Sequence, residues 1–285
     1  MSRRWNSDRV VLITGAAGGI GSALAERFVT AGDRVVLLDR DLAAVKELAA
    51  RLGTERALPV IADVCDPETL TEAVEQAVAS FGGLDVVVAN AGITPPAGTI
   101  RSMNTATVQR VLDVNVMGVF HTARATMDEL ARSGGHLHIS GSCSAFMPGA
   151  GGAPYMMSKA AVEQLARALR LEVADLGVTV GLSLLGIINT TLASATLDDD
   201  PFGRALDAMM PGPLRRRLPA DDAAAAMVDQ ISRRRARQVI PRTWSPLQLG
   251  RGALPAMDHL LVRNTRLRTM LADLDTRATP TPTPR

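Results

Sequence analysis

The chain's single tyrosine and one of its only two lysines stand four positions apart, in the stretch Tyr155-Met156-Met157-Ser158-Lys159. Residues four apart lie on the same face of a helix, so the phenol and the ammonium can share one pocket. A phenol with a pKa of about 10 is a poor acid or base at neutral pH. A neighbouring cation lowers that pKa, so the pair predicts proton transfer. A core tyrosine beside a solvated lysine has the same spacing, and the upstream sequence must decide between the two readings.

A glycine-rich segment near the N-terminus indicates a binding site. Val10 to Ile13 is an apolar run typical of a strand buried on both faces, and Ser22 to Ala31 has helical periodicity. Glycines between a strand and a helix let the backbone approach a pyrophosphate, and the helix N-terminus offers free N–H groups. The candidate phosphate-binding residues of this turn are Gly15, Gly18, Gly19, Ile20 and Gly21.

The end of the second predicted strand, Arg34 to Leu38, bears on the choice of cofactor. Asp39 follows it, roughly 20 residues after the glycine turn, where a carboxylate can accept both ribose hydroxyls of NAD and repel the 2′-phosphate of NADP. Arg40 beside it could instead attract that phosphate. We interpret Arg40 as solvent-facing or stacked on adenine, and we expect NAD to be preferred over NADP.

The rest of the chain continues the alternation of strand and helix. Strands are predicted at 58–62, 84–89, 135–140 and 178–185, and helices at 67–80, 105–132 and 158–174. This order predicts an α/β fold of Rossmann type, a doubly wound parallel sheet with helices on both faces. Ligands of such sheets bind beyond the carboxyl ends of the strands, where the polar candidates fall.

The glycine turn is followed in order by Asn90-Ala91-Gly92, Asn115, Ser142 and the Tyr155/Lys159 pair. With these motifs the chain resembles the short-chain dehydrogenase/reductase family, densely from Arg9 to Thr191. The resemblance implies that Tyr155 is the general acid–base and that Ser142 hydrogen-bonds the substrate oxygen. It implies that Lys159 lowers the pKa of Tyr155 and holds the nicotinamide ribose. Asn115 would bend its helix and hold a water that links Lys159 to solvent.

The same resemblance extends the set of expected cofactor residues. Asp63 and Val64 match the pair that receives adenine, and Asn90-Ala91-Gly92 matches the motif that steadies the sheet beside the ribose. After the sixth strand, the positions that match the lining of the nicotinamide carboxamide are Gly186, Ile188 and Thr190.

Several positions depart from the pattern of the family. His138 and Gly141 alter the usual Asn-Ile-Ser-Ser run, so Ser140 and Ser144 compete with Ser142, which has the usual separation from the tyrosine. Leu185 replaces the proline of the usual Pro-Gly pair, which leaves that turn less rigid. Gly181 replaces a common asparagine, and no consequence of this change is predicted.

The C-terminal half gives weaker signals. We expect one domain over residues 1–245 with an irregular substrate lid at about 192–219, an edge strand at 239–241, a helical extension at 246–278 and a disordered tail at 279–285. The extension could pack on the core, join a subunit interface or make peripheral membrane contact. Candidates for an apolar substrate pocket, or equally for core positions, are Phe146, Met147, Met156, Met157, Leu184, Leu185 and Met209.

Composition excludes several classes of protein. With 47% hydrophobic and 21% charged residues and a net charge of +2, the chain is typical of a soluble globular protein. The arginine runs lack aromatic stacking residues, so nucleic acid is not expected. Cys65 and Cys143 match no metal or disulfide spacing, so we expect no metal and a reducing, cytoplasmic location. No apolar run is long enough to span a membrane.

The resulting prediction is an NAD-dependent oxidoreductase that interconverts a secondary alcohol and its ketone, on a bulky, hydrophobic small-molecule substrate. One alternative is a reductase of carrier-protein-bound oxoacyl groups that uses NADPH. Another, of a different class, is a non-catalytic nucleotide-binding or scaffold protein, although such proteins typically lose the tyrosine or the lysine. The family resemblance also implies a homodimer or homotetramer.

Overall fold

The protein, described by a computed structural model over residues 8–278, is built on one parallel sheet of seven strands in the order β3-β2-β1-β4-β5-β6-β9. The chain winds outward from β1 to β3, returns to place β4 beside β1, and continues to β9 at the other edge. This is the doubly wound Rossmann-type sheet that the sequence predicts. Its strands are β1 Val10–Thr14, β2 Arg34–Asp39, β3 Ala57–Ile61, β4 Val86–Ala89, β5 His136–Ser142, β6 Thr179–Leu185 and β9 Arg237–Ile240.

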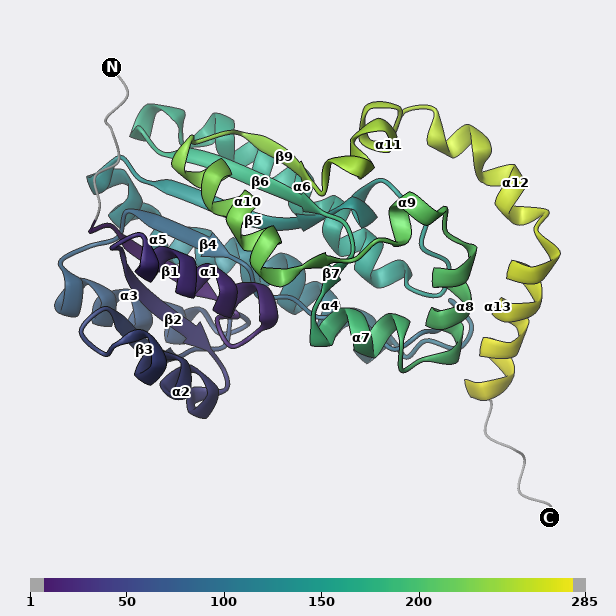
Figure 1. Ribbon diagram of the computed structural model, residues 1–285, viewed down its shortest axis with the longest axis horizontal. Helices are drawn as coiled ribbons and strands as arrows, with labels where there is room; N and C mark the ends of the chain where they lie inside the picture. The colour runs from purple at the N-terminus through teal and green to yellow at the C-terminus, as the bar shows by residue number, and fades with distance from the viewer. Residues whose placement is uncertain (1–7, 279–285) are drawn as a thin grey trace, which may run out of the picture.

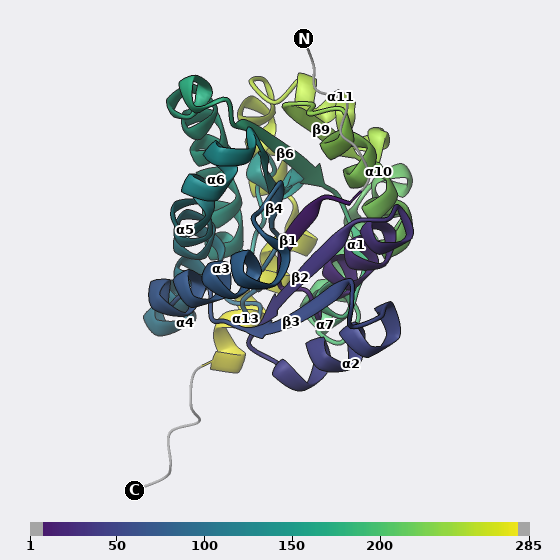
Figure 2. The same ribbon diagram turned by 90° about the vertical axis from the view of Figure 1, so that its left-hand side faces the viewer.

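Helices cover both faces of the sheet (Figures 1 and 2). One face carries α3 (Pro67–Phe81), α4 (Thr105–Leu112), α5 (Gly118–Ser133) and α6 (Ala153–Glu172). The other carries α1 (Gly19–Thr30), α2 (Leu42–Leu52) and α10 (Ala220–Ser232). Successive strand residues alternate between the two layers, so Leu12 packs toward α3 and Ile13 toward α1. Burial on both faces explains why the strands are almost wholly apolar.

Two element boundaries near the proposed catalytic residues differ from the prediction. β5 continues beyond Ser140 because Gly141 and Ser142 pair with Leu184 and Leu185 of β6. α6 begins at Ala153 rather than at Ser158, with a proline in its first turn. Tyr155 and Lys159 therefore both lie on this helix.

The helix predicted over 105–132 is interrupted. α4 ends at Leu112, a single π-helical turn occupies Asp113–Met117, and α5 follows from Gly118. Such turns insert an extra residue and frequently occur at functional sites. Asn115, which was expected to bend its helix, lies within this π turn.

The segment at 192–219, predicted to be irregular, is helical, and that prediction was wrong. It contains α7 (Thr191–Leu197), α8 (Pro201–Met209) and α9 (Gly212–Arg215), and β7 (Ile188–Asn189) pairs with β8 (Leu218–Pro219) at its two ends. Asp200 caps α8 by accepting from the amides of Phe202 and Gly203. An aspartate followed by a proline at the first helical position is a start signal that the sequence already carried.

The C-terminal segment forms an arch along one side of the molecule (Figure 1). It runs from η4 (Arg242–Trp244) through α11 (Ser245–Leu249), η5 (Leu254–Met257) and α12 (Asp258–Val262) to α13 (Thr265–Ala278), which contacts α8. The extension was predicted at 246–278, and η4 lies before that range, in the part assigned to the domain, while α11 to α13 match it to within one residue. The predicted tail at 279–285 lies outside the described residues. Within residues 8–278, no helix has the length and apolar character needed to cross a bilayer.

Candidate active site

The glycine turn after β1 is shaped by close backbone approaches. Gly15 has φ +65°, and a Cβ there would lie 2.8 Å from Ala91 Cα. A Cβ on Gly21 would lie 2.2 Å from the Gly15 carbonyl oxygen. Both positions therefore require glycine, and the turn delivers the N-terminus of α1, which begins at Gly19, to the edge of the sheet.

Thr14 and Asn90 tie the ends of three strands together. Thr14 Oγ1 accepts hydrogen bonds from the amides of Asn90 at 3.0 Å and Ala91 at 3.1 Å. Asn90 donates to the Thr14 carbonyl at 3.2 Å and accepts from Ser140 Oγ at 3.0 Å. Sequence reasoning did not assign this linking role to Thr14 or Ser140, although a threonine directly before the glycine turn was a signal for it.

The acidic residues predicted to meet the adenosine lie at strand ends. Asp39 Oδ2 accepts from the Ala17 amide of the glycine turn at 3.1 Å, which places this carboxylate beside the turn. Arg40 is exposed. Asp63 Oδ1 accepts from the Cys65 amide at 2.9 Å, and Val64 is buried.

Tyr155 and Lys159 lie on the same face of α6, as their spacing predicts. The ammonium of Lys159 lies 5.5 Å from the centroid of the Tyr155 ring and donates to the Ser140 carbonyl at 3.1 Å. Lys159 is 6% exposed, and its burial lowers its pKa to about 8.

The expected lowering of the tyrosine pKa is not found. Burial raises the pKa of Tyr155 above its usual value, and the nearby side chain of Ser142 opposes that rise. The Lys159 ammonium donates to the Ser140 carbonyl rather than to the phenol, so it does not offset the effect of burial. The phenol is therefore held in its protonated form.

The geometry separates the serines that competed for the catalytic role. Ser140 Oγ is engaged with Asn90. Ser142 Oγ donates to the Leu185 carbonyl at 3.2 Å and accepts from the Ser144 amide at 3.1 Å. The hydroxyl of Ser142 is thus fixed at the carboxyl end of β5, close enough to the Tyr155 phenol to act on its pKa.

Asn115 is fully buried in the π turn and faces the Tyr155 helix. Its side chain accepts from the Ile93 amide at 2.8 Å and donates to the Ile93 carbonyl at 2.9 Å and to Ser158 Oγ at 3.0 Å. A Cβ on Gly92 would lie 3.4 Å from Asn115 Oδ1 and 3.6 Å from Lys159 Nζ. Gly92, Asn115 and Lys159 are therefore neighbours, as predicted for one site.

The turn after β6 closes over the glycine turn. A Cβ on Gly19 would lie 3.0 Å from Thr190 Cγ2, so the two segments touch. Thr190 caps α7 by accepting from the Ala193 amide at 3.3 Å. Ile188 is buried, and Gly186 lies against Trp244, a residue that sequence reasoning did not consider.

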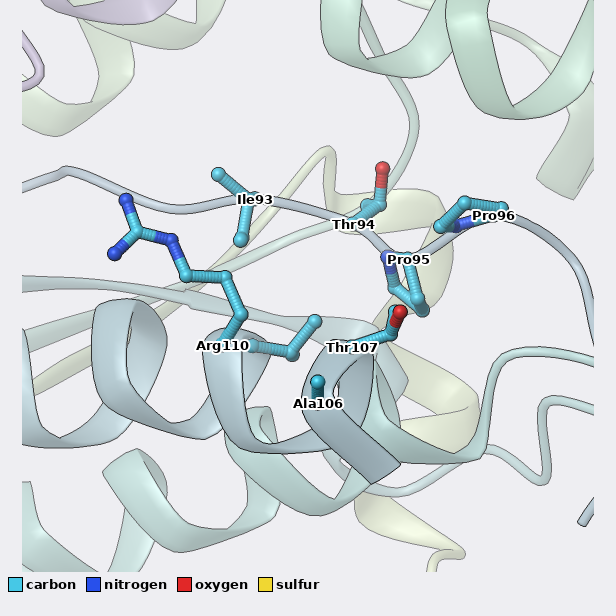
Figure 3. A pocket seen from close by; sticks show the side chains of 8 residues that line it. Ile93, Thr94, Pro95, Pro96, Ala106, Thr107 and Arg110 are labelled. Atoms are coloured by element: carbon cyan, nitrogen blue, oxygen red, sulfur yellow. The ribbon is translucent and has the colours of Figure 1, made fainter. Parts of the chain in front are cut away.

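Some of the proposed apolar pocket residues belong elsewhere. Leu184 and Leu185 are core residues on opposite faces of the sheet, whereas Met157 is 53% exposed. Phe146 and Met147 line a hollow of about 300 Å³ with residues of the extension, among them Arg251 and Leu254. Another hollow, of about 350 Å³, lies between α4 and the segment after β4 (Figure 3). Tyr155 is not among the residues that line it, and Arg110, which does line it, comes within 3.9 Å of Asp63 Oδ2.

The histidine that departs from the family pattern belongs to a buried polar chain. His136 and His138 approach each other at 3.4 Å, and His138 Nε2 contacts Ser183 Oγ at 2.9 Å. Ser183 in turn donates to Gln230 of α10 at 2.7 Å. A Cβ on Gly181 would lie 2.8 Å from a ring nitrogen of each histidine, so the glycine makes room for the pair. This is the consequence of Gly181 that the sequence did not reveal.

Comparison with known proteins identifies the class. The family model for short chain dehydrogenases matches residues 9–201. The chain is 38% identical over 223 residues to 1-deoxy-11-beta-hydroxypentalenate dehydrogenase of Streptomyces avermitilis, covering 76% of this chain and 78% of that protein. It is 32% identical over 196 residues to 2-(R)-hydroxypropyl-CoM dehydrogenase of Xanthobacter autotrophicus, covering 67% and 78%.

A solved structure agrees with these matches. The crystal structure of 3-ketoacyl-(acyl-carrier-protein) reductase from Brucella melitensis complexed with NADH superposes with a TM-score of 0.71 at 28% identity, covering 82% of this chain and 97% of the other. The chain belongs to the short-chain dehydrogenase family. It is an NAD(P)-dependent oxidoreductase of the alcohol dehydrogenase or ketoreductase type.

The residues at the sheet edge fit a dinucleotide. Gly15 and Gly21 allow the turn to pack tightly, because a Cβ there would meet Ala91 and the Gly15 carbonyl oxygen. A tight glycine turn between a strand and a helix is where folds of this type hold a pyrophosphate. The N-terminus of α1 faces the same edge, and its first turn holds no acidic residue that would repel an anion. In the described part of the chain, no cluster of His, Cys, Asp or Glu is suited to a metal ion.

Proposed function

We propose that this protein is an NAD-dependent oxidoreductase that interconverts a secondary alcohol and its ketone, with Tyr155 as general acid–base. The observation that carries the proposal is the convergence of Tyr155, Ser142 and Lys159 at the carboxyl edge of the sheet. A substrate oxygen placed between the phenol and the Ser142 hydroxyl would receive hydrogen bonds from both, once the hydroxyl turns away from the Leu185 carbonyl. Those bonds strengthen as negative charge develops on that oxygen.

The protonation states favour an acid role at neutral pH. When bound, the nicotinamide supplies or accepts the hydride at the substrate carbon. Because burial raises the pKa of Tyr155, the phenol carries its proton and can donate it to the substrate oxygen during ketone reduction. Alcohol oxidation needs the phenolate, so its rate should rise with pH while the rate of reduction does not.

Lys159 and Asn115 have supporting roles in this proposal. The pKa of Lys159 is lowered to about 8, so the ammonium is still mostly charged at neutral pH and can hold ribose hydroxyls. Asn115 links the π turn to Ser158, which itself donates to the Tyr155 carbonyl at 2.7 Å. Through these bonds Asn115 fixes the start of α6, and its neighbourhood with Lys159 suits a water that relays protons.

The preference for NAD rests on Asp39. Its carboxylate lies beside the glycine turn with lone pairs left for two ribose hydroxyls, and it would repel a 2′-phosphate. Ala17 and Gly18 provide no basic side chain to offset that repulsion, and Arg40 is exposed beyond the strand end. The similar reductase that carries NADH is consistent with this preference.

The substrate lid and the extension favour a hydrophobic substrate. Phe202 of α8 and Leu274 of α13 are 5% and 4% exposed and lie against Gly151, four residues before Tyr155. Asp275 accepts from Thr99 in the segment after β4, and so ties α13 to it. An apolar cover beside Tyr155 suits a bulky, uncharged alcohol or ketone. Because the similar solved structure is named a 3-ketoacyl reductase, a carrier-bound oxoacyl substrate stays the second candidate.

The expected homodimer or homotetramer has a surface that could support it. Large apolar side chains are exposed on the helices of one face of the sheet: Met117, Phe120, Met157 and Leu171. Apolar exposure on neighbouring helices is typical of a subunit interface. The cytoplasmic location remains a prediction.

A panel of ketones and alcohols, assayed by nicotinamide absorbance with each cofactor, tests this function. We expect reduction of hydrophobic ketones such as hexanophenone, with a higher kcat/KM for NADH than for NADPH. Size-exclusion chromatography with light scattering tests the assembly in the same preparation. A preference for small charged hydroxy acids, or for NADPH, would contradict the proposal.

A further inference from the structure

Trp244 lies at the same edge of the sheet as Ser142. It ends the 3-10 helix η4, directly after β9, and β9 runs parallel to β6 with Ile240 paired to Leu185. The carboxyl ends of β6 and β9 therefore lie side by side. The indole is 6% exposed and belongs to the core cluster on the α6 face, the face from which Tyr155 approaches the site.

The edge of the indole takes the place that a side chain at position 186 would fill. A Cβ on Gly186 would lie 2.5 Å from Trp244 Nε1 and 2.8 Å from its Cδ1. The Gly186 amide donates to the Ile240 carbonyl at 2.7 Å, which locks the two strand ends together. Gly186 and Trp244 are thus packed directly against each other, and the indole nitrogen could not lie there if residue 186 had a side chain.

The indole N–H has no hydrogen-bond acceptor among residues 8–278. A buried tryptophan usually finds a partner for its N–H, and leaving such a donor unpaired costs about 1–3 kcal/mol. Unpaired buried donors call for an explanation, and a ligand that binds beside the donor is one.

The position of Trp244 indicates which ligand could reach it. Gly186 follows Leu185, whose carbonyl accepts from Ser142 Oγ at 3.2 Å, so Gly186 and Leu185 link the indole edge to the serine of the proposed catalytic pair. α9 contacts η4 and contributes Leu214 to the same cluster, so the proposed lid passes over the tryptophan. A substrate held between Ser142 and Tyr155 would extend along this wall.

We propose that Trp244 binds the substrate: its indole N–H donates to a second acceptor oxygen, beyond the reacting hydroxyl or carbonyl, while its ring forms an apolar wall. The substrate class is then an alcohol or ketone that carries another carbonyl or ester oxygen near the reacting carbon. This inference rests on the proposed function, because it needs a substrate oxygen seated at Tyr155.

The two tryptophans of the chain, Trp5 and Trp244, make the donor directly observable. Protein labelled with ¹⁵N-tryptophan gives two indole N–H signals, and the Trp5→Phe variant assigns them. Ethyl benzoylacetate is the probe, and hexanophenone is its matched control without the second oxygens. Both are added with NAD⁺, with which a ketone forms a complex that cannot react. We expect the Trp244 proton signal to move downfield with the keto ester, and to move little with NAD⁺ alone or with hexanophenone.

The Trp244→Phe variant gives an independent readout, because it keeps an aromatic ring and removes the donor. Loss of one hydrogen bond should lower kcat/KM for ethyl benzoylacetate by about 10-fold, mainly through KM, with less than about a twofold effect on hexanophenone. Trp5→Phe is the control and should leave both values unchanged.

The outcomes separate this inference from the proposed function. If the wild type reduces none of the ketones with either cofactor, the proposed function fails and this inference falls with it. If it reduces them but the variant loses both probes equally, Trp244 has only a packing role and the inference alone is wrong. A Trp244 signal that shifts fully with NAD⁺ alone, or stays fixed at saturating keto ester, would also overturn it.

Discussion

Lys159 donates a hydrogen bond from its ammonium to the backbone carbonyl of Ser140 at 3.1 Å, two residues before Ser142 on the same strand. The helix that carries the tyrosine is thereby attached to the strand that carries the serine. The lysine is buried to make this contact, and its pKa falls to about 8. The buried ammonium is therefore needed for the proposed function, but its burial lowers the stability of the fold.

Lys159→Met should remove activity while stabilising the fold. A pKa lowered from 10.5 to about 8 means that the folded state disfavours the charged lysine at neutral pH. Removing it should raise the free energy of unfolding by on the order of 2 kcal/mol at pH 7, after the loss of the bond to Ser140. The gain should be complete below about pH 8 and vanish as pH rises past 10.5. Urea unfolding across this range measures it, and a variant less stable than the wild type at pH 7 would contradict the prediction.

His138 should make the protein sensitive to acid. Burial lowers the pKa of His138 from 6.5 to about 3, so below pH 6.5 the unfolded chain takes up a proton that the folded chain does not. The associated stability is complete above pH 6.5 and falls by up to about 1.4 kcal/mol per pH unit toward pH 3. Urea unfolding between pH 7 and pH 4.5 should show a smaller loss for His138→Ala than for the wild type. Equal losses in the two proteins would rule out this assignment.

Gly181→Ala should destabilise the protein, because the new methyl would meet both histidine rings at 2.8 Å. We expect a cost of about 1–3 kcal/mol from this overpacking. The double variant with His138→Ala should recover part of that loss, since one of the two rings is then gone. A double-mutant cycle on thermal unfolding measures the coupling between the two sites. Strictly additive effects would show that Gly181 is not kept free for the histidines.

Asp39→Ser should change the choice of cofactor. Loss of the carboxylate removes an acceptor for the ribose hydroxyls and the repulsion of a 2′-phosphate. We expect kcat/KM for NADH to fall by about 10-fold or more while the value for NADPH rises. Asp41→Ser is the matched control, because serine can keep the cap that Asp41 gives α2 through the Ala44 amide, so the cofactor ratio should not change. An unchanged ratio in Asp39→Ser would remove the basis for the NAD preference.

The sequence predicted the sheet well because each strand is marked by a short run of apolar residues that can be recognised without knowing its neighbours. The run from Val10 to Ile13 is buried on both faces, and the glycine turn after it has local backbone requirements that leave little choice of residue. Tyr155 and Lys159 were brought together correctly because helical spacing alone places them on one face. Ser142 was placed after its strand rather than in it, because the extension of β5 depends on pairing with Leu184 and Leu185.

What could not be predicted depends on contacts between distant segments. The need for glycine at position 181 becomes clear only in the folded chain, where His136 and His138 of the neighbouring strand lie against it. Trp244 meets Gly186 because two strands far apart in the sequence end side by side. The raised pKa of Tyr155 follows from its burial in the folded chain, which the spacing to Lys159 does not reveal. The helices α7 and α8, in contrast, were missed although Asp200-Pro201 marked a start.

The turnover of Tyr155→Phe tests the central claim most directly. The substitution removes one hydroxyl and keeps the ring, and binding of NADH, followed by fluorescence titration, should stay within about twofold of the wild type. For the ketone that the wild type reduces best, kcat should fall by about 10²–10⁴-fold, the usual contribution of a general acid. A Tyr155→Phe enzyme that binds NADH normally and reduces this ketone at a rate within a few-fold of the wild type would contradict the account.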